Sequence, residues 1–168
     1  MKKLFLTLIA IAATSFASLA DTSLEQAYKA ISSMKGMTER SVGTANVGDA
    51  EIGAMKTSAV SVSGDAVIDY RKSVIYELEN LPIRNIVIGA NNQREMASVY
   101  AEPAGQGLYN VLIVTANCLD GNFSASLGKT DAAGVKAIRN CNLEMDSAGL
   151  VVSTSEAPGA PALITMTF

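Results

Sequence analysis

The residues best suited to chemistry in this 168-residue sequence are two cysteines, Cys118 and Cys141, because the chain contains no histidine. Without histidine, the commonest general base, the neutral imidazole ligand and the Ser-His-Asp triad are all excluded. A zinc site would need thiolates and carboxylates alone, and a cysteine nucleophile would need another activating base. We therefore expect no metal, no cofactor and no cysteine-based catalysis.

Acidic side chains are the second source of chemistry. Asp65 and Asp69 lie four residues apart, and Glu77 and Glu79 follow on the same segment. Two carboxylates can divide acid and base roles in glycan hydrolysis when burial raises the pKa of one of them. The surrounding sequence does not indicate such burial. A carboxylate-dependent hydrolase acting on envelope glycans is therefore kept as an alternative function.

The first twenty residues have the three-part pattern of a cleavable secretory signal peptide. Lys2 and Lys3 precede an uncharged apolar run, and Ser18-Leu19-Ala20 places small residues before the expected cleavage point. The apolar run is shorter than the roughly 20 residues that a membrane-spanning helix needs. We expect export to the periplasm or the extracellular space of a bacterium, with a single domain over residues 21–168.

The mature chain is acidic. Removing the two signal lysines reduces the 13 basic side chains to 11 against 16 acidic ones, a net charge of −5. Nucleic-acid binding relies on basic surfaces, so this charge argues against it. No later segment is long and apolar enough to cross a membrane as a helix. The expected partner is an envelope protein, a glycan or a small ligand.

Export bears on the cysteines, since both follow the signal peptide. An oxidising compartment permits a disulfide between Cys118 and Cys141. Closing a loop of this length would stabilise the fold by roughly 3 kcal/mol in the chain-entropy model. We expect this disulfide, and the alternative is two buried free thiols.

Apolar spacing predicts two helices in the first half of the mature chain. Thr22 and Glu25 form a capping-box pattern ahead of a helix over 23–35. Gly-interrupted, Ser- and Thr-rich residues 40–63 predict one or two strands. Ser63-Gly64-Asp65 then begins a second helix, which Pro82 ends.

The second half is typical of short strands separated by turns. Strands are predicted over 83–88, 96–101, 109–118, 122–127, 150–154 and 163–168, with a short third helix over 131–139. Asp120-Gly121 between two of these segments is a hairpin signal. The predicted fold is α+β, an antiparallel sheet of short strands and hairpins with two or three helices packed on one face.

The last residues support a different fold. Ile164, Met166 and Phe168 alternate with threonines, as in the final strand of a small outer-membrane β-barrel. The final strand of a half-buried sheet shows the same alternation. The barrel is kept as a second alternative.

Two segments resemble a family of small exported proteins of unknown function from gut-type Gram-negative bacteria. One is Tyr28 to Val42, with Met34-Lys35-Gly36-Met37-Thr38 after a helix; the other is Val99 to Ile138, with Gly128-Lys129-Thr130-Asp131 leading into a helix. The resemblance implies an exported domain and assigns no functional residue. With no catalytic motif complete, the expected function is non-enzymatic binding or a structural role at the cell envelope.

Overall fold

The computed structural model describes residues 21–83, 85–91, 94–146, 149–154 and 162–163. The helices in these ranges are α1 (Ser23–Ser32), α2 (Gly64–Glu79) and α3 (Ala132–Arg139). The strands are β1 (Thr38–Val47), β2 (Ala50–Ser61), β3 (Asn85–Asn91), β4 (Glu95–Gly105), β5 (Leu108–Asn117), β6 (Asn122–Asp131), β7 (Cys141–Asp146), β8 (Gly149–Thr154) and β9 (Ala162–Leu163).

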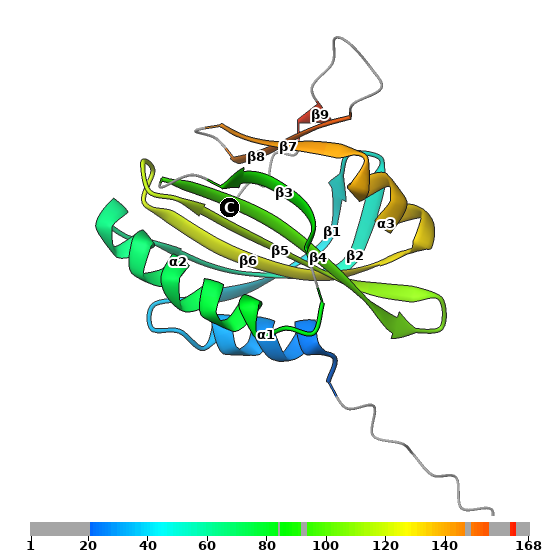
Figure 1. Ribbon diagram of the computed structural model, residues 1–168, viewed down its shortest axis with the longest axis horizontal. Helices are drawn as coiled ribbons and strands as arrows, with labels where there is room; N and C mark the ends of the chain where they lie inside the picture. The colour runs from blue at the N-terminus through cyan, green and yellow to red at the C-terminus, as the bar shows by residue number, and fades with distance from the viewer. Residues whose placement is uncertain (1–20, 84, 92–93, 147–148, 155–161, 164–168) are drawn as a thin grey trace, which may run out of the picture.

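A six-stranded antiparallel sheet organises the molecule. Its strand order is β1-β2-β6-β5-β4-β3, so the hairpin β1–β2 joins the meander β3–β6 through the pairing of β2 with β6. Helices α1 and α2 lie on one face of this sheet (Figure 1). A smaller sheet, β7-β8-β9, lies beyond the opposite face, with β7 against β3. The predicted α+β class is confirmed.

Helix α1 begins where the sequence predicts. The Thr22 hydroxyl accepts a hydrogen bond from the Glu25 N–H, and the Glu25 carboxylate accepts one from the Thr22 N–H, which completes the capping box. The helix ends at Ser32, three residues earlier than predicted. Gly36, at φ 88°, then turns the chain toward β1.

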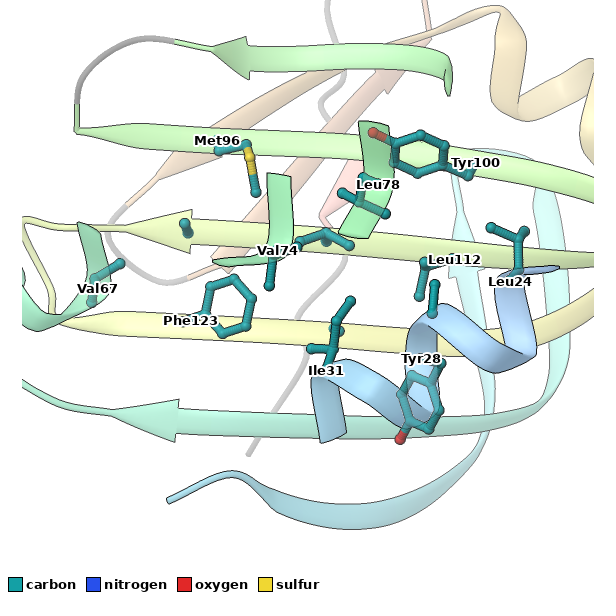
Figure 2. Packing of buried hydrophobic residues seen from close by; sticks show 14 residues of the cluster. Leu24, Tyr28, Ile31, Val67, Val74, Leu78, Met96, Tyr100, Leu112 and Phe123 are labelled. Carbon is teal, nitrogen blue, oxygen red and sulfur yellow. The ribbon is translucent and has the colours of Figure 1, made fainter. Parts of the chain in front are cut away.

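The helix-facing side of the sheet holds the larger apolar core. Leu24 and Ile31 of α1 and Val74 of α2 point at Leu112 and Phe123 of the sheet (Figure 2). The Tyr70 ring of α2 stacks on the Phe123 ring, with centroids 5.6 Å apart. On each helix the buried residues recur at helical spacing and lie on the face that meets the sheet. This is why the spacing of apolar residues in the sequence predicts both helices.

The opposite face holds a second apolar cluster, which the sequence analysis did not anticipate. Val99 of β4 and Val111 and Ile113 of β5 meet Ile138 of α3 there. Helix α3 therefore packs on the face opposite α1 and α2, so that two of the three described helices share a face. Strand β7 is also absent from the predicted elements, since its sequence Cys-Asn-Leu-Glu-Met-Asp has no β-branched residue.

Most other predicted elements are found within two or three residues of their expected bounds at one end or both. The exception is the predicted closing strand over 163–168: only its first residue falls within the described residues, in β9. Ile164, Met166 and Phe168, on which the barrel alternative depends, lie outside them.

The turn between β5 and β6 lies directly against the start of α2. The Val62 N–H donates to the Gly121 carbonyl oxygen over 2.8 Å, and a Cβ on Gly121 would overlap the Val62 carbonyl oxygen. Gly121 also has φ 69°, a conformation that favours glycine. The hairpin signal Asp120-Gly121 is thus also a packing requirement.

We expect Gly121→Ala to destabilise the protein by about 3–5 kcal/mol, because backbone strain and overlap add. The matched control is Gly43→Ala in β1, which has φ 85° but open space around the added methyl group; it should cost only about 1–2 kcal/mol. Urea denaturation of both variants measures the difference. Equal losses would show that the contact with Val62 does not constrain this turn.

Candidate functional site

The expected disulfide is not formed in the structure. Cys118 and Cys141 are both free, and Cys118 packs beside the cluster under α1 and α2 whereas Cys141 belongs to the cluster on the opposite face. The six-stranded sheet therefore separates the two side chains. Of the alternative, two buried free thiols, the structure has both thiols free but only Cys141 buried; Cys118 is partly exposed.

The Cys141 thiol is placed for packing rather than for reaction. It is buried, and its Sγ lies 3.2 Å from the Ala137 carbonyl oxygen, to which it donates. Burial, with a smaller contribution from Asp49, raises the pKa of this thiol. A raised pKa leaves less of the nucleophilic thiolate of Cys141 at neutral pH.

The acidic residues proposed for glycan hydrolysis do not converge. Asp65, Asp69 and Glu79 are exposed and Glu77 is partly exposed, all along α2. Asp69 lies 3.9 Å from the Lys72 ammonium, one turn away, as in an ordinary solvated helix surface. Neither pair is buried, as two carboxylates that divide acid and base roles would need to be.

Metal binding and membrane insertion would each need a feature that can be recognised in the described residues. Within the described residues, no group of three or more cysteine, aspartate or glutamate side chains is close enough to hold a metal ion. None of the helices described is both long enough and apolar enough to span a membrane.

The turn from Glu102 to Tyr109, between β4 and β5, divides into two parts. Glu102 is buried and accepts a hydrogen bond from the Leu24 N–H at 2.5 Å, so it caps α1 and does not face a ligand. The tip, Gly105-Gln106-Gly107, is exposed, with all three residues at positive φ. The exposed part of the turn thus centres on this tip, with Pro103 and Leu108 exposed on either side of it.

Pairs of serine and threonine hydroxyl groups link neighbouring strands on the sheet face opposite α1 and α2. Thr57 and Ser126 are 2.8 Å apart, and Thr115 and Ser124 are 2.7 Å apart, each pair in direct register. The sequence signal was the alternation of serine with apolar residues in Phe123-Ser-Ala-Ser-Leu127, which was used only to predict a strand. Because each hydroxyl has a partner, these pairs stabilise the sheet.

Strand β1 is the most exposed of the helices and strands whose side-chain burial the structure describes. The side chains from Thr38 through Thr44 are all exposed, and β1 pairs with β2 on one side only. Its pairing is regular from Thr38 to Ser41 and then shifts twice around Gly43. The stretch Thr38–Ser41 is therefore a regularly paired strand edge whose outward N–H and C=O groups lack a strand partner in the described structure.

The beginning of β1 is also close to α1. The buried Tyr28 hydroxyl faces the exposed Glu39 carboxylate without closing a hydrogen bond. Burial, followed by this carboxylate, raises the pKa of Tyr28, so its hydroxyl stays protonated. Glu39 thus lies on the α1 side of the edge, and Arg40, the next residue, points to the other side.

Comparison with known proteins does not assign this site: no protein family, curated protein or solved structure matches the chain. The exposed edge of β1 is therefore a candidate binding site on the basis of its geometry alone.

Thiol labelling checks the placement of the cysteines. In the native protein we expect an alkylating agent to modify the partly exposed Cys118 first, and Cys141 only after unfolding, because burial protects it and raises its pKa. Cys118→Ser is the control and should remove the fast reaction. An intact mass two hydrogens below that of the reduced chain, with no labelling after unfolding, would instead show that the two cysteines are bridged.

Proposed function

We propose that this protein is an exported, non-enzymatic binding domain of the cell envelope, and that it holds an extended segment of a partner polypeptide along the Thr38–Ser41 edge of β1. The observation that carries the proposal is the exposed outer edge of this strand, which is regularly paired with β2 from Thr38 to Ser41. The signal-peptide pattern of residues 1–20 supports export.

Backbone geometry supports strand addition at this edge. An edge strand presents alternating N–H and C=O groups, and an extended peptide satisfies them by forming one more strand of the sheet. The other edge strand of the sheet, β3, lies against β7 of the smaller sheet. Of the two edges, β1 is the one that leaves room for an added strand.

Side chains on the edge indicate the chemistry of the partner. Residues directly opposite each other in an antiparallel pair have their side chains on the same face, where opposite charges attract. Glu39 and Arg40 extend to opposite faces of β1. The best-matched partner strand places a basic residue opposite Glu39 and, at the adjacent position, an acidic residue opposite Arg40.

The register shifts around Gly43 set the length of the site. Bulges twist a strand edge and interrupt pairing, and they are one means by which proteins limit unwanted edge-to-edge association. An added strand would therefore pair along Thr38–Ser41 and stop before Gly43. A short contact of this kind is suited to reversible recognition.

Photo-crosslinking in producing cells tests the location of binding. A photoreactive residue at Val42 on β1, which is 46% exposed, should form a protein adduct. The matched position is Tyr76 on α2, which is 69% exposed and should form none. An adduct at Tyr76 alone would place the interaction on another surface and contradict the proposal.

A pair of proline variants then tests the backbone mechanism. Successive N–H groups on an edge strand point alternately to solvent and to the paired strand, so Arg40→Pro and Ser41→Pro remove one of each kind. The variant with the higher Tm has lost the solvent-facing group, and it should also lose the Val42 adduct. If that stable variant still forms the adduct, strand addition is not the mode of binding.

Export has its own test. Cell fractionation followed by N-terminal sequencing should recover a chain that begins at Asp21 in the periplasmic or extracellular fraction without detergent. A chain that retains residues 1–20 in the cytoplasm would contradict the proposed location and leave the binding geometry to be tested separately.

A further inference from the structure

The first turn of α1 is held by residues from far along the chain. The Leu24 N–H donates to Glu102 of β4 at 2.5 Å, and the Asn110 side-chain amide of β5 donates to the Thr22 hydroxyl at 2.7 Å. Glu102 and Asn110 are buried cross-strand partners, 78 and 88 residues after the groups they bind. The β4–β5 hairpin therefore completes the cap of α1.

Helix α1 cannot be stable without that hairpin. It has ten residues, and isolated helices shorter than about 12–15 residues are marginal in water. Its buried residues, among them Leu24 and Ile31, pack on Leu112 and other residues of the sheet (Figure 2). Both its apolar face and its N-terminal hydrogen bonds depend on strands that follow it in the chain.

The meander β4–β6, by contrast, is built from local contacts. Strands β4 and β5 pair from Gly105–Leu108 outward, and β5 and β6 pair from Asn117–Asn122 outward. Contacts between residues close in sequence cost less loop entropy and form sooner than distant ones. The surface that receives α1 can thus form before the helix docks.

We propose that α1 is a late-closing strap, which docks only after the β4–β5 hairpin presents Glu102 and Asn110. This inference goes beyond the proposed function, and only its consequence for processing rests on the proposed export. The expected cleavage point follows Ala20, two residues before the N-cap Thr22. Because α1 docks only after this hairpin has formed, the peptide bond remains accessible to the signal peptidase while the hairpin forms.

Folding kinetics test the order of events in the chain from Asp21 to Phe168, which contains every described element. Leu24→Ala in α1 should speed unfolding and leave the folding rate nearly unchanged, with a φ-value below about 0.2. Ile113→Val, on the β5 face away from α1, should slow folding, with a φ-value above about 0.5. If Leu24→Ala does not fold, Ile31→Val gives the same readout with a smaller perturbation.

A φ-value for α1 equal to or above that of Ile113→Val would contradict the late docking of α1. This result holds whether or not the protein is exported. The consequence for processing has a separate readout. Purified signal peptidase should cleave the full chain several-fold faster when added at the start of refolding than when added after folding is complete. Equal rates would show that closure of α1 does not control access to the cleavage point, and neither result depends on binding at β1.

Discussion

Strand β5 is apolar on both of its faces, and the rest of the structure depends on covering both. Val111, Leu112, Ile113 and Val114 are consecutive and each is at most 1% exposed. Successive side chains of a strand point to opposite sides, so no single layer can bury all four. Burying one such side chain contributes about 1.5–3 kcal/mol, which is enough to fix a layer on each side of the sheet.

The two layers differ, and the difference leaves one strand exposed. Helices α1 and α2 cover the Leu112 face, and α3 contributes to the cover of the Ile113 face, while the smaller sheet lies beyond that face. The first part of strand β1, from Thr38 through Thr44, adds no buried side chain to either layer; it is exposed and paired to β2 alone, and only the end of the strand, at Val47, enters the cluster on the α3 face. The layers that bury the central strands thus leave the edge of β1 uncovered, and this edge is the proposed binding site.

Local patterns made much of this fold predictable, whereas the candidate site depends on topology. The apolar spacing of α2 and the run in β5 are local, and both were predicted. The inward position of Glu102 was not, because it follows from a contact with Leu24, 78 residues earlier. Likewise, no spacing rule shows that Cys118 and Cys141 lie on opposite faces, since that depends on the path of β6 and α3 between them. The exposed edge of β1 required the strand order, which sequence patterns do not contain.

Amide hydrogen exchange of the free protein tests the central claim most directly, because it needs no identified partner. If the outer edge of β1 is open, alternate amides in the stretch Thr38–Ser41 exchange rapidly, while the intervening amides, bonded to β2, are protected. The amides of β5, paired on both sides, should be the reference for full protection. Protection of every amide in Thr38–Ser41 would mean that this edge is already paired in the free protein, and would contradict its assignment as the binding site.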